Sequence, residues 1–180
     1  MSVKKIAVIS LLAVGLCVFA YGSFRSAGLS EKNEDIPREQ LVNPGEINVS
    51  QRDSIVSFAT ELLGTPYIVA SSSREGFDCS GFVYFVFKHH KIQVPRSSGG
   101  FSNFGKEIPI ENVKKGDILV FLSPTSNIIG HIGIVTNPKG KQSNFIHATS
   151  GREMKVIITS LKQEGYARRF VKAVDVLSDL

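Results

Sequence analysis

The stretch Phe77-Asp-Cys-Ser-Gly-Phe-Val-Tyr-Phe-Val-Phe-Lys-His-His90 decides how this chain folds. Its aromatic and β-branched residues favour a strand. The run from Cys79 to His90 also has the length of a helix, with apolar residues at helical spacing and Asp78 as a suitable N-cap. The pattern alone leaves helix and strand open. A helix would place Cys79 in its first turn.

Upstream of this stretch, the sequence predicts a helix that begins near Ser50. Ser50 and Asp53 form a start that resembles a capping box. Gly64 and Pro66 then stop the helix. The apolar residues between these signals fall at helical spacing: Ile55, Phe58, Ala59, Leu62 and Leu63.

Downstream, the C-terminal half alternates between apolar and polar residues, as a sheet does. Short turns containing glycine, proline and asparagine separate most of the candidate strands. Helices followed by a run of strands predict an α+β fold, in which N-terminal helices pack on a C-terminal antiparallel β-sheet. The candidate strands are Ile118–Leu122, Ile132–Thr136, Asn144–Ala148, Met154–Thr159 and Phe170–Val174.

The beginning of the chain has the features of an export signal. Lys4 and Lys5 supply a positive start, and the apolar or small run Ile6–Ala20 follows. This run has 15 residues, which is short for a membrane-spanning helix. We therefore predict a signal peptide over residues 1–22 and an exported protein of the periplasm or cell envelope.

Two other forms of anchoring stay open as alternatives. The signal can remain uncleaved, or Cys17 can carry a lipid, although Leu16 stands where lipoprotein signals have a small residue. Residues 23–49 are polar and contain glycine and proline, which predicts a flexible linker. We assign residues 50–180 to a catalytic domain and expect membrane contact only through the signal or an anchor.

The charge balance excludes a strongly basic protein. The 21 basic and 16 acidic residues give a net charge of +5, and loss of the two signal lysines lowers it to +3. Because the net charge is small and the basic residues are scattered, the sequence does not predict a nucleic-acid partner. It suits an anionic substrate such as a wall polymer.

Removal of the signal leaves Cys79 as the sole cysteine, and such a residue is either a reactive thiol or a buried inert one. A thiol reacts as the thiolate, which a helix N-terminus and a neighbouring imidazolium favour. A shift of ~2 pKa units needs about 2.7 kcal/mol. A helix terminus supplies at most ~2 kcal/mol. The sequence therefore predicts a histidine beside Cys79.

Two histidines lie on adjacent predicted strands. A three-residue turn in Asn137-Pro-Lys-Gly-Lys141 would pair Asn137 with Lys141, which places His131 directly opposite His147. A shift of one residue would separate them onto opposite faces of the sheet. Two unrelated strand histidines are the alternative.

Six motifs occur in an order and spacing that together resemble the NlpC family of papain-like cell-wall cysteine peptidases. The resemblance covers about residues 50–175 and is closest to the Spr-type murein endopeptidase lipoproteins. The motifs are Gly64-Thr-Pro-Tyr67, Phe77-Asp-Cys-Ser-Gly-Phe82, Val94-Pro-Arg-Ser-Ser98, Lys115-Gly-Asp-Ile-Leu-Val-Phe121, Gly130-His-Ile-Gly-Ile-Val135 and Phe145-Ile-His-Ala-Thr149.

The resemblance implies a catalytic triad. Cys79 would attack the scissile carbonyl from a helix N-terminus, His131 would act as general base and acid, and His147 would orient His131. A thioester acyl-enzyme would follow. The implied fold is papain-like, with no metal or organic cofactor.

Three further residues are candidates for contact with the substrate or the oxyanion. The resemblance places Tyr67 beside the nucleophile, although an aromatic packed on the core is the alternative. Ser80 follows the nucleophile directly. Arg96 would bind a substrate carboxylate, with a structural arginine as the alternative. Asp78 is interpreted as a cap rather than a catalyst.

The implied substrates are the stem peptides of bacterial peptidoglycan, and we expect a monomer. Two other functions stay open. An acyltransferase or deamidase would use the same scaffold, and a wall-binding module would lack catalysis. Cys79 and the two histidines could resemble a zinc site, but zinc binding would need a third ligand with suitable geometry.

Overall fold

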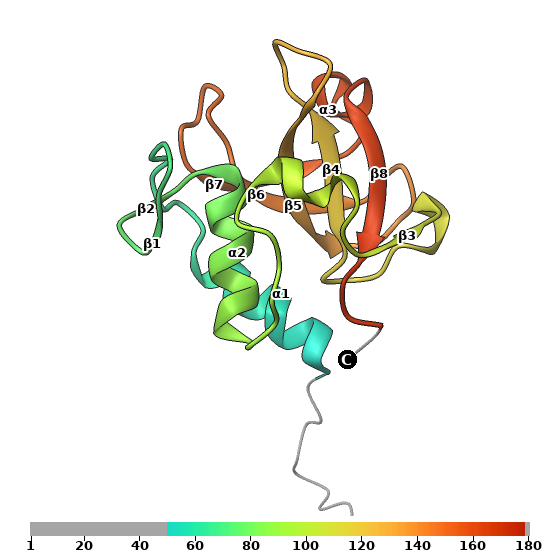
Figure 1. Ribbon diagram of the computed structural model, residues 1–180, viewed down its shortest axis with the longest axis horizontal. Coiled ribbons are helices and arrows are strands. Elements are labelled where there is room, and N and C mark those ends of the chain that lie inside the picture. Colours follow the sequence, from blue (N-terminus) through green and yellow to red (C-terminus); the bar gives the residue numbers. More distant parts are fainter. Residues whose placement is uncertain (1–49, 179–180) are drawn as a thin grey trace, which may run out of the picture. The chain divides into compact units, whose positions relative to one another are not determined.

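A computed structural model of the chain describes residues 50–178 (Figure 1). The predicted signal peptide and the predicted linker lie outside the described residues. The helices are α1 (Gln51–Glu61), α2 (Cys79–His89) and α3 (Glu164–Ala167), with short 3-10 turns at Ser98–Ser102 and Ile110–Asn112. The strands are β1 (Ser72–Ser73), β2 (Gly76–Phe77), β3 (Lys106–Ile108), β4 (Ile118–Leu122), β5 (Ile129–Asn137), β6 (Asn144–Ala148), β7 (Val156–Ser160) and β8 (Phe170–Asp175).

Helix α1 forms where the capping pattern predicts it. The Ser50 hydroxyl accepts a hydrogen bond from the Asp53 amide at 3.1 Å. Gly64 then adopts a φ of +83°, which ends the helical path. Ile55 and Ala59 are fully buried and face the core.

The fold-deciding stretch is a helix. An Asp78 carboxylate oxygen accepts a hydrogen bond from the Gly81 amide at 2.6 Å, and Cys79 is the first residue of α2. The aromatic residues that favour a strand are tolerated because they fill the space between α1 and the sheet, where packing outweighs propensity. The helix buries Phe82, Val83, Val86 and Phe87.

The six-stranded sheet has the order β3-β8-β4-β5-β6-β7, and every pairing is antiparallel, which confirms the predicted α+β fold. Strands β4 to β7 form a meander, and β8 returns to pair with β4 (Figure 1). The edge strand β3 was not predicted, because two of its three residues are exposed and charged. Strand β7 starts later than predicted, since Met154 adopts a φ of +47°.

Both faces of the sheet are covered. In β4, Ile118 and Val120 belong to the main core with the helices. Leu119 and Phe121 point to the other face and pack in a second, smaller core. Tyr166, from the segment before β8, packs against that second core. Among residues 50–178, none of the helices is long and apolar enough to cross a membrane.

The predicted register between β5 and β6 is wrong by two residues. The structure pairs Ile134 with Ile146 and Val135 with Phe145. Continuation of that register places His147 two residues away from the position directly opposite His131.

The shift has a local cause in the connection between the two strands. The Ser143 hydroxyl donates to the Gly140 carbonyl at 2.6 Å and accepts from the Lys139 amide at 2.8 Å. These bonds close a longer loop than the predicted turn, so Asn137 pairs with Asn144 and not with Lys141. Because the shift is an even number of residues, both histidines stay on one face as diagonal neighbours.

Candidate active site

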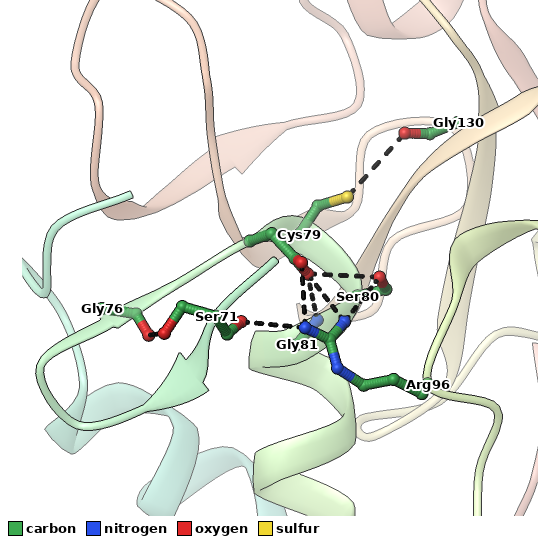
Figure 2. Close-up of polar contacts among 8 residues, drawn as sticks. Ser71, Gly76, Cys79, Ser80, Gly81, Arg96 and Gly130 are labelled. Atoms are coloured by element: carbon green, nitrogen blue, oxygen red, sulfur yellow. Dashed lines mark hydrogen bonds and ion pairs between the residues drawn. The ribbon is translucent and has the colours of Figure 1, made fainter. Parts of the chain in front are cut away.

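Cys79 lies beside the first part of β5, which pairs with β4 but not with β6. Strand β5 pairs with β4 from Ile129 onward, whereas its pairing with β6 starts only at Ile134. The Cys79 sulfur approaches this unpaired part of β5 and lies 3.8 Å from the Gly130 carbonyl oxygen (Figure 2). The thiol therefore sits between the start of α2 and the start of β5.

A polar network fixes the start of α2 behind the thiol (Figure 2). Arg96 donates to both carboxylate oxygens of Asp78, at 3.0 and 2.9 Å, and to the Ser71 carbonyl at 3.2 Å. The Ser80 hydroxyl donates to Asp78 at 3.2 Å. A side chain at Gly81 would collide with the Ser71 carbonyl oxygen. This close approach explains why glycine stands two residues after the nucleophile.

The two predicted histidines meet. Nε2 of His131 lies 2.9 Å from Nδ1 of His147, and Nε2 of His147 lies 2.9 Å from the Thr159 hydroxyl oxygen. His147 and Thr159 are buried. The arrangement leaves Nδ1 of His131 as the ring nitrogen that is available to the thiol.

The direction of these hydrogen bonds follows from the chemistry required of His131. To accept a proton on Nδ1, His131 must carry its own proton on Nε2 and donate it to His147. His147 then donates from Nε2 to Thr159. Sequence reasoning missed Thr159, because it carries no motif and its place depends on the pairing of β6 with β7.

Tyr67, Cys79 and His131 line a single pocket. Gly130, Tyr166, Arg169 and the segment 149–151 complete most of its wall. His147 supports this wall from behind through His131. Ser80 and Arg96 do not belong to the lining, and their predicted contact with the substrate stays a prediction.

The thiol is protonated in the free protein. Burial raises the pKa of Cys79, and the Asp78 carboxylate raises it further. The backbone amides of Ser80, Ile132 and Cys79 act in the opposite direction but do not compensate. The sequence pattern predicts a lowered pKa for Cys79, whereas burial of the sulfur raises it.

The histidines are neutral in the free protein. Burial lowers the pKa of His131 to about 3, with a further contribution from the charge of Arg169. Burial lowers the pKa of His147 to about 2, with further contributions from His131 and Arg169. The site at rest therefore holds a neutral thiol beside a neutral imidazole.

Tyr67 reaches the pocket from the segment that follows α1. Its amide donates to the Met154 carbonyl at 2.9 Å, which ties this segment to the start of β7. Burial raises the pKa of Tyr67, and the nearby acidic groups Cys79 and Asp78 raise it further. The phenol therefore stays protonated and can donate a hydrogen bond. Its role toward an oxyanion stays a prediction.

Within residues 50–178, no group of three or more histidine, cysteine, aspartate or glutamate residues is arranged to hold a metal ion. A thiol and two linked imidazoles are side chains of the kinds that acyl transfer uses as nucleophile, base and orienting group.

Comparison with known proteins agrees with this fold. The sequence model of the NlpC/P60 family matches residues 64–175. A γ-D-glutamyl-L-lysine dipeptidyl-peptidase from Bacillus cereus is 32% identical over 71% of this chain and 37% of its own length. The Escherichia coli murein DD-endopeptidase MepS/murein LD-carboxypeptidase is 29% identical over 73% of this chain and 66% of its own length.

The solved structures agree. The crystal structure of an NlpC/P60 family protein from Bacillus cereus superposes with a TM-score of 0.63 at 32% identity, over 73% of this chain and 42% of that one. The chain thus spans well under half the length of the Bacillus cereus proteins that it matches.

Proposed function

Because this chain belongs to the NlpC/P60 family, we propose that it is a cysteine peptidase that hydrolyses the stem peptides of bacterial peptidoglycan. The observation that carries the proposal is the shared pocket of Cys79 and His131, in which the bond to His147 leaves Nδ1 of His131 for the thiol. The names of the relatives and the predicted export signal support the wall substrate.

Acylation begins when the Cys79 sulfur attacks the scissile carbonyl carbon while its proton moves to Nδ1 of His131. Proton transfer accompanies formation of the C–S bond, because the pKa values of the free pair favour the neutral form. Collapse of the tetrahedral intermediate breaks the C–N bond, and His131 returns the proton to the departing amine. The product of this half-reaction is a thioester on Cys79.

Deacylation reverses the roles with water. His131 removes a proton from a water molecule, whose oxygen attacks the thioester carbonyl. The C–S bond breaks, the acyl group leaves as a carboxylic acid, and the sulfur regains its proton. The Cys79 backbone amide and the Tyr67 hydroxyl are the donors that we assign to the oxyanion in both steps.

Digestion of purified muropeptides tests the proposal. The wild-type protein is expected to release fragments that together carry the mass of one added water, and Cys79→Ala is expected to release none. Cys79→Ser tests the need for a sulfur nucleophile within nearly the same volume. Mass spectrometry of the products gives both the reaction type and the bond that is cut.

The same experiment separates the alternatives. Products in which an added amine is joined to the acyl group would identify an acyltransferase, and loss of ammonia from an amide would identify a deamidase. Equal lytic activity of wild type and Cys79→Ala would refute the nucleophile. Binding of the wall polymer without any new product would identify a binding module.

A further inference from the structure

Arg169 is a pocket residue that the proposed chemistry does not use. It directly precedes β8 and lines the pocket together with Cys79 and His131. Its Nε donates to the Gly165 carbonyl at 2.7 Å, and its Nη1 donates to the Leu122 carbonyl at 2.9 Å. The guanidinium also lies over the Tyr166 ring, 5.0 Å from the ring centroid. The side chain is therefore held in one orientation.

The charge of Arg169 has no acidic partner among the described residues. None of the ion pairs found in residues 50–178 involves it. Its Nε and Nη1 donate to neutral carbonyls, and the guanidinium also meets the Tyr166 hydroxyl, which carries no charge while its raised pKa keeps it protonated. Arg96, which lies outside the pocket lining, differs because it binds both carboxylate oxygens of Asp78. An acidic group near this wall of the pocket is Glu153. It is exposed, and its charge raises the pKa of Tyr166.

We propose that Arg169 binds a carboxylate of the substrate that lies a few bonds from the scissile amide. An oriented guanidinium with free donors suits a carboxylate better than a neutral group, since charge-assisted hydrogen bonds are the stronger kind. The inference rests on the proposed function, and it names the chemical feature that the peptidase selects.

Stem peptides offer such a carboxylate on either side of the bond. A glutamyl residue linked through its side-chain carboxyl keeps its α-carboxylate free on the acyl side. A diamino acid that ends the peptide keeps its own carboxylate on the amine side. Both sources share one chemistry, and the experiment distinguishes them.

Binding of a carboxylate at Arg169 would also assist the chemistry. The charge of Arg169 lowers the pKa of both His131 and His147. His131 becomes a cation during acylation, so an unneutralised guanidinium nearby opposes that step. A bound carboxylate compensates the guanidinium charge and raises the pKa of His131 at the moment when it must accept a proton. The carboxylate therefore contributes to kcat as well as to KM.

The test uses three peptides that contain the same γ-D-glutamyl bond to a diamino acid. The parent has both carboxylates, the second has an α-carboxamide on the glutamyl residue, and the third has a carboxamide on the diamino acid. We expect wild type to cut one of the two carboxamides about 10- to 100-fold less efficiently than the parent, as for loss of a charge-assisted hydrogen bond. Arg169→Gln should lower kcat/KM for the parent by a similar factor and leave the poor carboxamide within about threefold.

Two variants control for general effects. Arg168 is the adjacent arginine, 72% exposed and paired with Glu164, so Arg168→Gln should leave all three rates unchanged. Arg169→Lys keeps the charge without the planar fork and should restore part of the preference. Thermal unfolding of each variant reports whether the fold is intact.

Binding measurements separate this inference from the proposed function. Calorimetry compares the three peptides on Cys79→Ala with and without Arg169→Gln. One result supports the carboxylate site alone: Cys79→Ala binds the parent at least tenfold more tightly than one carboxamide, and Arg169→Gln abolishes that difference. If the wild type nevertheless cuts none of the peptides, the carboxylate site stands and the proposed hydrolysis fails. Equal binding of all three peptides, or an equal loss for all three in Arg169→Gln, would overturn the carboxylate site.

Discussion

At the scale of single residues, the site is a neutral relay that runs from the thiol into the protein interior. Cys79 and His131 line one pocket, His131 contacts His147, and His147 contacts the Thr159 hydroxyl. Burial makes charge costly at every step of this relay. The protons must therefore move during the reaction rather than before it.

The raised pKa of Cys79 predicts how the free protein reacts with iodoacetamide. Alkylation requires the thiolate, and a pKa above the ordinary value means that this form appears only as the pH rises past that of a free cysteine. Labelling of Cys79 between pH 5 and 10, followed by mass spectrometry, should be slower than that of free cysteine at neutral pH and still increase above pH 9. A rate plateau that begins below pH 7 would show a thiolate–imidazolium pair instead.

Thr159 supplies a second prediction. Thr159→Val removes the acceptor for His147 and favours the histidine tautomer that blocks proton transfer to Nδ1 of His131. An unsatisfied buried group costs about 1–3 kcal/mol, which corresponds to a fall in kcat of roughly 5- to 100-fold. KM should change little, and Thr159→Ser should restore most of kcat. Steady-state kinetics of both variants decide this, and a serine variant as slow as the valine variant would exclude the hydrogen-bond role.

At the scale of elements, α2 and β5 hold the reacting groups against each other. The N-cap Asp78 and its partner Arg96 fix the beginning of α2. The early start of β5, which pairs with β4 before it pairs with β6, leaves the backbone that receives the thiol. The position of the nucleophile therefore depends on how closely α2 approaches the Ser71 carbonyl.

Gly81→Ala tests this close approach. The added methyl group would overlap the Ser71 carbonyl oxygen and would lie 2.9 Å from an Asp78 carboxylate oxygen, so the start of α2 must move. We expect a loss of stability of about 1–3 kcal/mol and a fall in kcat. Gly99→Ala is the matched control, since nothing lies within 4 Å of its added carbon. Urea unfolding and kinetics of both variants give the comparison, and an unaffected Gly81→Ala would contradict this reason for the glycine.

At the scale of the whole molecule, local patterns and long-range packing contributed differently to what could be predicted. The cap at Ser50 is local and located the first helix. The cap at Asp78 is also local and fits the second helix, but the residue pattern alone left helix and strand open there. The alternation of apolar residues located most of the strands and placed the two histidines on one face. The register between β5 and β6 was wrong, because the hydrogen bonds of Ser143 lengthen the connecting loop.

Other features of the site could not be found by local patterns. Thr159 and Arg169 reach the site only through the pairing of β7 and the path of the chain before β8. The raised pKa of the thiol depends on how deeply α2 is buried, which no spacing of residues reports. These features follow from tertiary packing, whereas Cys79 and His131 stand in motifs that the sequence displays.

Arg52 links the first helix to the far end of the sheet. It binds Asp117 at 2.6 Å and Asp175 at 2.8 Å, and the Asp117 side chain is fully buried. Arg52→Met leaves these two carboxylates without their cation, which should destabilise the protein by about 3 kcal/mol at pH 7. Burial already raises the pKa of Asp117, and Arg52 lowers the pKa of both carboxylates. Loss of the cation therefore raises both pKa values, so protonation relieves part of the penalty and the loss of stability should be smaller at pH 5.

Thermal or urea unfolding at the two pH values measures the effect of Arg52→Met. The exposed pair of Lys115 with Asp53, at 2.7 Å, provides the control. Lys115→Met should cost less than about 1 kcal/mol at either pH. If both variants lost a similar free energy of unfolding, burial of the Asp117 carboxylate would not be the reason for the effect of Arg52→Met.

The complete burial of His147 also determines how its hydrogen atoms exchange with the surroundings. Its ring lies under Phe145 and Tyr166, with centroids 4.7 and 5.2 Å away, and both ring nitrogens face protein atoms. Bulk water has no direct route to this imidazole. Its ring N–H should therefore give a sharp, far-downfield proton resonance that persists in water at room temperature, and Thr159→Val should broaden or abolish that signal.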